Sequence, residues 1–554
     1  MATILVDPTF PSNGAGTLGN PRNIPPTSVA YGDLVLFKEG TNANLGATGW
    51  TVPAPSGTPS LTNQLVIGTY AADTGLQTQD PNRRAQLTVT GNSDVIFIQN
   101  DHVRVENLYL YGAKTFPSAG VRALNCSYIT VKGNRITSGP VTTGGGYGVR
   151  LDNATGSGAA RSNWTIVGNT VERTGGNSAL ACVWSSTAGE NVTDITITDN
   201  DVTGNPIPVA SAVNHGVQVI ARAAALNANR SGLCARGMRI ERNTVRRTHA
   251  YGYSISGVVA GGTQPNVFRG NKAFEIGDGG TDMHCMWFAC CDDWLIEGNL
   301  VDGSNAWIGQ DVGTGIGIFI DKPAADADGC NRVVVRGNLV RNTGRGATLN
   351  SEVGGAGIAS LLSNDILIEG NIVENCNNGI IAIGRYSGNG STRITIRHNL
   401  IANHKETGIY AVKDAQNVSV LNNICIGGKY GIGIQNSGVL PVTVGYSETN
   451  NLIFGASIYN YMGSNEPEAA VPAYVSRTAP AIGFTQNPRL VDASRPWLGL
   501  SPDSPAIGKA AYVPDACDVY GYRYGSLPNI GPFAWANTPS RPSRQGYAIP
   551  MARS

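Results

Sequence analysis

Three observations predict that this chain folds as an all-β solenoid, a single-stranded right-handed parallel β-helix of about a dozen coils. A short apolar phrase around an asparagine recurs along the chain. Strands with period-two alternation fill the intervals, and no stretch of about twelve residues has helical spacing. Glycine is abundant, with 71 residues among 554, while charged residues make up only 14% of the chain. Many tight turns and few surface charges are typical of stacked coils.

The recurring phrase sets the register of the coils. Residues 296–301 read Ile-Glu-Gly-Asn-Leu-Val, and residues 335–340 read Val-Arg-Gly-Asn-Leu-Val. We expect each asparagine to adopt a left-handed turn conformation and to hydrogen-bond to its counterpart in the next coil, which is a structural role. The marker asparagines are Asn107, Asn134, Asn169, Asn200, Asn243, Asn271, Asn299, Asn338, Asn371, Asn399, Asn423 and Asn451.

Composition divides the chain into four segments. Residues 91–460 carry the repeat and form the expected β-helix. Residues 1–90 and 461–535 are rich in proline, and we expect them to cap the N-terminal and C-terminal ends, because both ends of a solenoid expose unpaired strands and core. Residues 536–554 are expected to form a tail.

Charge and cysteine content exclude several classes of protein. The net charge of +1 is too small to concentrate a nucleic acid by its field. No apolar run approaches the roughly 18 residues of a membrane helix, so membrane insertion is not expected. The N-terminus has no basic region followed by an apolar core, so no export signal is expected. The ten cysteines lack metal-binding spacing, which predicts free buried thiols and neither a metal nor a cofactor.

Phrases near both ends of the chain resemble those of a known family. Residues 32–38 read Gly-Asp-Leu-Val-Leu-Phe-Lys, residues 65–70 read Leu-Val-Ile-Gly-Thr-Tyr, and residues 487–492 read Asn-Pro-Arg-Leu-Val-Asp. With the coils between them, they resemble the pectate-lyase-like right-handed parallel β-helix family, and most of all its bacteriophage tailspikes and polysaccharide depolymerases. That family contains lyases, hydrolases, epimerases, tailspikes and adhesins, so the resemblance specifies the fold better than the reaction.

The resemblance implies a phage tailspike, a receptor-binding protein that binds and depolymerises a bacterial capsular polysaccharide, lipopolysaccharide or exopolysaccharide. Such a protein is made in the host cytoplasm and incorporated into the virion, which agrees with the absence of an expected export signal. The resemblance further implies a homotrimer and contacts with phage tail or baseplate proteins. Two alternatives remain open: a non-catalytic glycan-binding fibre or adhesin, and an exported, extracellular polysaccharide lyase without its signal peptide.

The candidate site lies on the outward face of one column of strands in the central coils. In residues 315–321, alternation directs the three isoleucines inward and turns Gly317, Phe319 and Asp321 outward. Alignment of the coils turns Trp287 outward in the preceding coil and brings Arg385 into the Asp321 column. We therefore expect aromatic, acidic and basic side chains to share one face.

The loops leading into these strands are acidic, which suits a glycosidase. Its two carboxyl groups stand about 5 Å apart for retention, or roughly 6.5–9.5 Å for inversion, and stacked coils supply both spacings. The tryptophans are suited to stacking on sugar rings. A lyase would instead need a base beside a uronate carboxylate, for which His284, Lys322 or Arg385 could serve. The predicted catalytic residues are Asp282, His284, Asp311, Asp321, Glu352 and Arg385. The predicted substrate-binding residues are Trp287, Trp307, Phe319 and Lys322.

Other aromatic and histidine residues have simpler interpretations. Trp294 falls in an inward column and is expected in the core. The remaining histidines show no ligand spacing, and we expect them in turns or at the surface: His102, His215, His249, His398 and His404.

Overall fold

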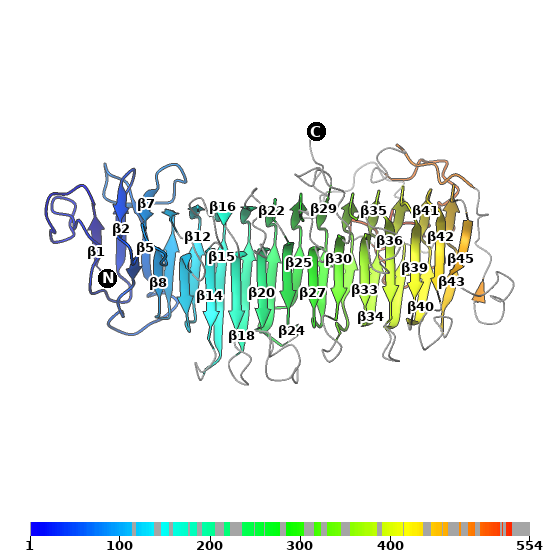
Figure 1. The fold of residues 1–554 in the computed structure, drawn as a ribbon, viewed down its shortest axis with the longest axis horizontal. Coiled ribbons are helices and arrows are strands. Elements are labelled where there is room, and N and C mark those ends of the chain that lie inside the picture. The colour runs from blue at the N-terminus through cyan, green and yellow to red at the C-terminus, as the bar shows by residue number, and fades with distance from the viewer. Residues whose placement is uncertain are drawn as a thin grey trace. The chain divides into compact units, whose positions relative to one another are not determined.

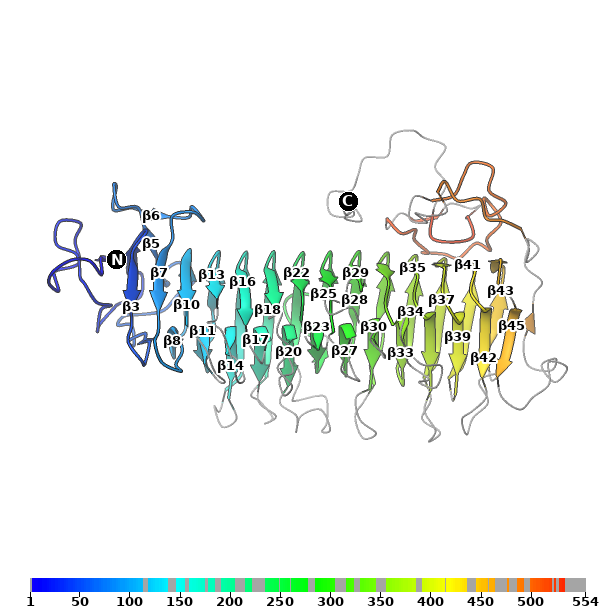
Figure 2. The same cartoon turned by 45° about the horizontal axis from the view of Figure 1, so that its top comes forward.

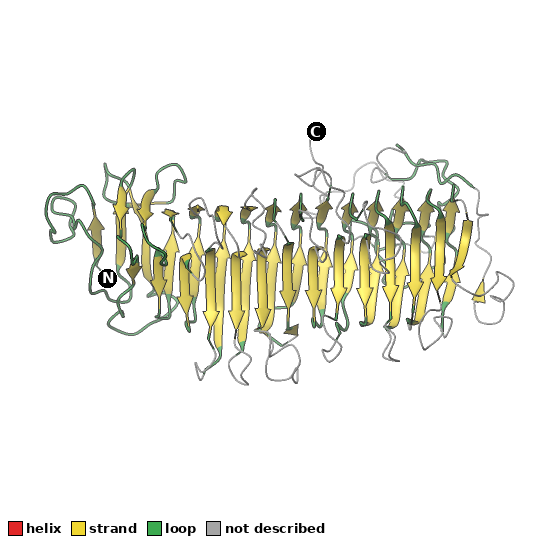
Figure 3. Ribbon diagram, in the orientation of Figure 1, coloured by secondary structure: helices red, strands yellow, loops and turns green. Residues whose placement is uncertain are grey.

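The structure of the protein is a computed structural model. The structure describes residues 2–112, 118–137, 146–154, 159–174, 178–184, 191–204, 215–221, 235–248, 250–259, 261–277, 284–303, 315–322, 329–344, 355–384, 391–413, 415–435, 445–456, 458–463, 476–477, 486–492, 499–520, 523–524 and 528–533. They belong to two compact units, unit 1 (Met1–Asn266) and unit 2 (Val267–Ser554). None of the described residues is helical, so no helix among them could span a membrane (Figure 3).

Each unit is a right-handed parallel β-helix, as predicted, with strands arranged in three sheets that we name A, B and C (Figure 1). A complete coil contributes one strand to each sheet in the order A, B, C. Neighbouring strands are parallel, and only the short β6 pairs antiparallel to β5 among the described strands. Short strands suit this arrangement, because each is flanked by turns and buries its inward side chains against the other two sheets.

In unit 1, sheet A consists of β1 (Thr3–Val6), β2 (Leu34–Lys38), β5 (Leu65–Tyr70), β6 (Gln77–Thr78), β9 (Val103–Glu106), β12 (Ile129–Lys132), β15 (Arg161–Val167), β18 (Val192–Thr198), β21 (Ala235–Glu241) and β24 (Val258–Val259). Sheet B consists of β3 (Asn42–Asn44), β7 (Ala85–Thr88), β10 (Leu108–Tyr111), β13 (Arg135–Thr137), β16 (Thr170–Thr174), β19 (Asp201–Gly204) and β22 (Thr244–Arg246). Sheet C consists of β4 (Trp50–Thr51), β8 (Ile96–Ile98), β11 (Ala119–Leu124), β14 (Tyr147–Asn153), β17 (Ser178–Trp184), β20 (His215–Ala221) and β23 (Tyr251–Ser256).

At the boundary, β25 spans Asn266–Arg269. In unit 2, sheet A consists of β28 (Trp294–Glu297), β31 (Val334–Arg336), β34 (Asn364–Glu369), β37 (Thr392–Arg397), β40 (Gln416–Leu421), β43 (Ser447–Thr449) and β46 (Ser476–Arg477). Sheet B consists of β26 (Lys272–Phe274), β29 (Leu300–Asp302), β32 (Leu339–Arg341), β35 (Ile372–Glu374), β38 (Leu400–Ala402), β41 (Ile424–Ile426) and β44 (Leu452–Phe454). Sheet C consists of β27 (His284–Ala289), β30 (Ile316–Asp321), β33 (Ala356–Leu361), β36 (Asn378–Ile383), β39 (Thr407–Val412), β42 (Tyr430–Gln435) and β45 (Ile458–Gly463).

A ladder of buried asparagines occupies the turn between sheets A and B. Asn371 Oδ1 accepts the backbone N–H of Asn338 at 3.0 Å and its side-chain amide at 2.9 Å. Asn371 Nδ2 in turn donates to the carbonyl of Val335 at 2.9 Å. Ladders of this kind confirm the register in both units. Their members are Asn134, Asn169, Asn200 and Asn243 in unit 1, and Asn271, Asn299, Asn338, Asn371, Asn399, Asn423 and Asn451 in unit 2.

Two details of that prediction are wrong. Asn107 is not a ladder member: Leu108 occupies the equivalent position and donates its N–H to Asn134 Oδ1 at 3.0 Å. The left-handed conformation belongs to the residue before each ladder asparagine, for example Gly370 with φ of 64° before Asn371. Glycine is frequent there because it adopts positive φ without a steric penalty.

Alternation is also broken at the start of the sheet C strands. A Cβ atom added to Gly317 would lie 2.3 Å from Val340 Cγ1 in the core, so Gly317 faces inward and not outward as predicted. Ile316 instead packs in the cluster that contains Phe319 on the outer face. Trp294 is confirmed in the core, with its ring 5.6 Å from that of Phe288.

Residues 499–520 and 528–533, which we name the C-terminal segment, lie along the outer face of sheet B in unit 2 (Figure 2). The outward side chains of that sheet form an apolar stripe, which consists of Leu300, Leu339, Ile372, Leu400, Ile424 and Leu452. The covering side chains are Leu500, Ala506, Val519, Ile530 and Phe533. Burial of these apolar surfaces against each other stabilises the docked segment.

A histidine anchors this docked segment. The ring of His398 stacks on Tyr524 at 4.4 Å, and its Nδ1 lies 3.2 Å from the carbonyl of Asn529. Asn422 Nδ2 lies 3.1 Å from His398 Nε2, so the ring donates on one side and accepts on the other. Burial, with a smaller contribution from the charge of Arg397, lowers the pKa of His398 to about 4. The neutral ring is therefore the form that fits.

We predict that replacing Asn371 with alanine lowers the free energy of unfolding by about 3 kcal/mol, because a buried N–H and a buried carbonyl lose their partners. Thermal and urea unfolding monitored by circular dichroism would measure the change. Thr395→Ala, a half-buried outer-face substitution on β37, is the control. Equal stability of the two variants would contradict a supporting role for the ladder.

Acidification is predicted to loosen the C-terminal segment. The pKa of His398 is below its unfolded value of about 6.5, so the folded state binds fewer protons. Its contribution to stability is present above about pH 6.5 and is lost as the pH falls towards 4. Hydrogen exchange of residues 511–520 and 528–531 should accelerate over this range. The variant His398→Phe keeps a ring but has no ring nitrogen, so this pH-dependent acceleration of exchange should disappear. If the acceleration persists in that variant, another titrating group causes it.

Candidate functional site

The structure brings four of the predicted site residues together on sheet C of unit 2. Strands β27 and β30 are neighbours, and their register places Trp287 opposite Phe319 and Ala289 opposite Asp321. Trp287 Nε1 donates a hydrogen bond to Asp321 Oδ2 at 2.8 Å. The His284 ring meets the Phe319 ring edge to face, with centroids 4.7 Å apart. An indole, an imidazole and a carboxylate therefore share one patch.

This patch borders an apolar outer face. Phe319 is 5% exposed and packs with Ala359 and Ile381 of the next two coils, while Trp287 is only partly buried. Asp321 is 7% exposed, and its hydrogen bond to the indole compensates part of the cost of burying its carboxylate. Trp287 is thus the more accessible ring of the patch.

The sequence predicts six further residues for the site. The structure describes one of them, and five lie outside the described residues. Lys322 is half-buried and follows β30 directly. The residues outside the described ranges are Asp282, Trp307, Asp311, Glu352 and Arg385. The carboxylate pair that glycoside hydrolysis requires therefore has one described member, Asp321.

In unit 1, the outer face of sheet C has a different character. One column crosses six neighbouring strands and consists of Phe97, Arg122, Arg150, Ala181, Gln218 and Ser254. Most of these side chains are polar, although they stand where unit 2 carries the Trp287–Phe319–Ala359–Ile381 column. A polar column on a largely buried face needs partners for its hydrogen-bonding groups.

Two arginines on adjacent coils form the charged part of this column. Arg150 is 8% exposed and donates from Nη2 to Asp152 Oδ2 at 2.7 Å. Arg122 Nη2 lies 3.8 Å from the same carboxylate, and Arg122 Nη1 lies 3.7 Å from Asp94 Oδ2. Both arginine–carboxylate distances of Arg122 exceed hydrogen-bond length. Burial raises the pKa of Asp94, with Arg122 acting in the opposite direction.

Aromatic rings hold both guanidinium groups. The Arg122 guanidinium lies 5.4 Å from the centre of the Phe97 ring, and that of Arg150 lies 4.8 Å from the centre of the Tyr147 ring. Both distances are in the range of cation–π attraction. These contacts fix both arginines in position. The Arg122 side chain is nevertheless 21% exposed, so it is accessible to a ligand.

A histidine–tyrosine pair lies beside the polar column. His215 and Tyr251 stand opposite each other on β20 and β23, with their rings stacked 5.0 Å apart. Burial lowers the pKa of His215 to about 4, so its imidazole is neutral at physiological pH. The sequence-based placement of this histidine at a turn or the surface is wrong, because strand β20 buries it to 8% exposure.

Several buried polar atoms of this face have no hydrogen-bond partner in the described part of the chain. They are Arg122 Nε, His215 Nδ1 and Ser254 Oγ. Buried polar groups without partners are uncommon in folded proteins and often mark a site that receives water, an ion or a ligand. The face therefore offers a cation, an imidazole and a hydroxyl along one row of coils.

The sequence contains a signal for this face that sequence reasoning missed. Gly-Val-Arg occurs at residues 120–122 and again at residues 148–150, and Gly-Val-Gln follows at residues 216–218. The glycine faces the core, where an added Cβ at Gly120 would lie 2.6 Å from Ile136 Cγ2, and the residue two positions later faces outward. The repeated triplet could have identified a polar outward column.

None of the protein-family models and none of the curated protein sequences matches the chain. Among solved structures, it is similar to pectate lyase Pel9A, with 12% identity over 96% of both chains and a TM-score of 0.32. It is similar to a PL6 alginate lyase in complex with a trisaccharide, with 13% identity over 87% of this chain and 94% of that chain, and a TM-score of 0.44. It is also similar to the Dettilon tailspike protein, with 12% identity over 80% of this chain and 64% of that chain, and a TM-score of 0.35. These similarities concern the fold alone, and the strand order of both units confirms the predicted right-handed parallel β-helix.

Proposed function

We propose that this protein binds an acidic polysaccharide along the outer face of sheet C in unit 1. The observation that supports this proposal is the pair of arginines on adjacent coils, Arg122 and Arg150, each held against an aromatic ring. Asp152 binds Arg150 directly, whereas Arg122 stands beyond hydrogen-bond distance of both Asp94 and Asp152, so its N–H groups are available to an anionic ligand. A guanidinium group recognises a carboxylate through paired N–H donors.

The chemistry of the remaining column fits a chain of sugars. Gln218 accepts a hydrogen bond from Ser178 Oγ at 2.7 Å, and Ser254 offers a buried hydroxyl further along the same row. Successive coils repeat about every 4.8 Å, so equivalent polar groups recur along a line. A linear polymer with repeated hydroxyl groups can follow such a line, whereas a compact ligand would use only one or two coils.

Cleavage of the bound polysaccharide is a second proposal, supported by different residues. On sheet C of unit 2, Asp321 would act as one carboxylate of a glycosidase pair, with Trp287 stacking on a sugar ring. The buried Asp321 carboxylate beside a partly exposed indole supports this assignment. The remaining residues of that proposal are Asp282, Asp311, Glu352, Arg385, His284, Trp307, Phe319 and Lys322.

We also propose that the natural ligand is a bacterial surface polysaccharide and that the protein is a phage tailspike. The sequence resemblance supports this setting. A homotrimer is part of the same proposal, and its mass in solution is measured by light scattering. A monomer at micromolar concentration would favour a different setting.

Arg122→Gln is expected to weaken binding to a uronate polysaccharide such as alginate or pectate by about 10- to 100-fold, because a charge-assisted hydrogen bond contributes about 1.5–3 kcal/mol. Affinity electrophoresis in gels containing each polymer would measure the change. Arg122→Lys should restore only part of the binding, because lysine keeps the positive charge but lacks the paired N–H donors of a guanidinium group. Arg239→Gln, an exposed substitution on sheet A, is the control. Unchanged retardation of Arg122→Gln by every acidic polymer would contradict the proposal.

Replacing Asp321 with asparagine is expected to lower chain shortening by about 100-fold or more if this carboxylate is part of the cleavage machinery. Trp287→Phe removes the same hydrogen bond but leaves the carboxylate, so it should retain most of the activity. Size-exclusion chromatography of the polymer measures shortening, and ultraviolet absorption of unsaturated ends identifies a lyase. Equal activity of Asp321→Asn and wild type would exclude Asp321 from the reaction.

A further inference from the structure

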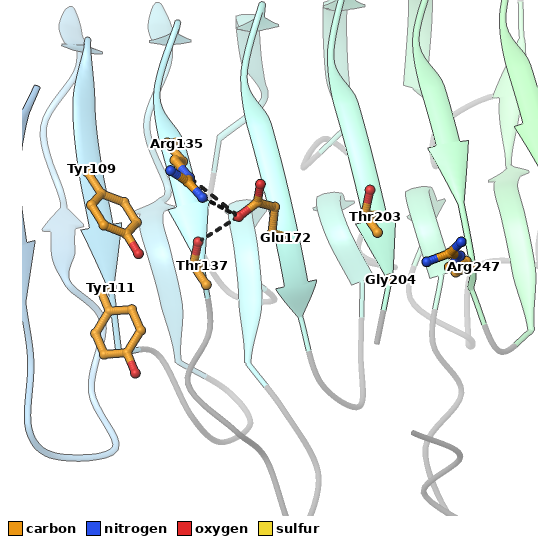
Figure 4. A pocket seen from close by; sticks show the side chains of 8 residues that line it. All are labelled: Tyr109, Tyr111, Arg135, Thr137, Glu172, Thr203, Gly204 and Arg247. Atoms are coloured by element: carbon orange, nitrogen blue, oxygen red, sulfur yellow. Dashed lines mark hydrogen bonds and ion pairs between the residues drawn. The ribbon is translucent and has the colours of Figure 1, made fainter. Parts of the chain in front are cut away.

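A groove opens on sheet B of unit 1, on a different sheet from the arginine column. Its volume is about 570 Å³, and the residues that line it come from five successive coils (Figure 4). The lining residues are Tyr109, Tyr111, Arg135, Thr137, Glu172, Thr203, Gly204 and Arg247. A concave site of this size that combines aromatic rings with a few polar groups is suited to a small ligand or one unit of a polymer.

Two tyrosines form one wall of the groove. Tyr109 and Tyr111 alternate with two buried leucines on β10, so both rings stand on the outer face. Their ring centres lie 6.4 Å apart at an interplanar angle of 66°. Both side chains are only half-buried, and together they present apolar ring surface beside phenol hydroxyls.

The next two coils add a charged pair. Arg135 stands opposite Tyr109 in the neighbouring strand, and its guanidinium lies 5.2 Å from the centre of that ring. Arg135 Nη2 donates to Glu172 Oε2 at 3.0 Å, and Thr137 Oγ1 lies 3.4 Å from the same oxygen. Because this ion pair is solvent-accessible, it contributes little to stability. Ligand hydroxyl groups can therefore replace the contact between Arg135 and Glu172.

The corresponding sheet in unit 2 provides a contrast. There the outward residues are leucine and isoleucine, and the C-terminal segment covers them. In unit 1 one outward column of sheet B consists of Tyr109, Arg135, Thr170, Asp201 and Thr244. Such a column has little apolar area for a protein segment to bury, which favours a hydroxyl-rich ligand over a packed peptide.

We propose that this groove is a second glycan-binding site, which stacks a neutral sugar ring on Tyr109 and Tyr111. Arg135 and Glu172 bind the ring hydroxyls, Arg135 as donor and Glu172 as acceptor. The site is independent of the acidic-polysaccharide site, because it lies on another sheet and shares no residue with it. A polymer with both neutral and acidic units could contact the protein through both sites.

A glycan array printed with neutral and uronate-containing oligosaccharides tests this proposal. Wild-type protein should bind a subset of the neutral glycans, and the double variant Tyr109→Ala, Tyr111→Ala should lose about tenfold or more of that signal. Tyr109→Phe, Tyr111→Phe keeps both rings and should retain most of it. Circular dichroism of each variant verifies that the β-helix is folded.

The outcomes separate this proposal from the proposed function. Arg122→Gln should reduce only the signal on uronate-containing glycans, and the tyrosine variant only the signal on neutral ones. No binding of wild type to neutral glycans, or equal neutral binding by the alanine double variant, would overturn the second site. Loss of both signals in the folded alanine double variant would also overturn it as an independent site.

Discussion

The fixed register between neighbouring coils is the constraint on which the rest of this structure depends. Parallel strands bind each other through backbone hydrogen bonds at a spacing of about 4.8 Å, and the buried asparagine ladder reinforces that register at one turn. Asn371 Oδ1 accepts two N–H donors from the preceding coil, so a slip of one residue would leave buried polar groups unpaired. Insertions between strands can therefore vary in length without shifting the columns.

Fixed columns let each unit present a different outer surface on the same scaffold. On sheet C, the position two residues after the inward glycine is Arg122 and Arg150 in unit 1 but Phe319 in unit 2. On sheet B, tyrosine, arginine and threonine line a groove in unit 1, whereas leucine and isoleucine in unit 2 are covered by the chain's own C-terminal segment. Polar columns leave a surface for ligands, and apolar columns are buried by protein.

Particular residues show how far sequence reasoning reaches. Trp287 and Asp321 could be placed on one face because they follow the same repeated phrase and strand period, and the structure joins them by a hydrogen bond. Asn107 was misplaced by one position, because it stands where other coils have the positive-φ residue, and Leu108 takes the ladder position. Gly317 was placed on the wrong face because a strict period of two was assumed along the whole of β30, whereas Gly317 faces the core and Ile316 packs on the outer face.

By itself, the sequence determined the solenoid, its coil register and the core role of residues such as Trp294, because these depend on local periods that repeat along the chain. Only the tertiary structure decided which side chains meet across coils. Arg122 and Arg150 are 28 residues apart, and His398 reaches Asn529 across 131 residues. Such contacts depend on the lengths of intervening loops and on the path of the C-terminal segment. No local period encodes these features, so the groove on sheet B and the docking of the C-terminal segment emerged only from the folded chain.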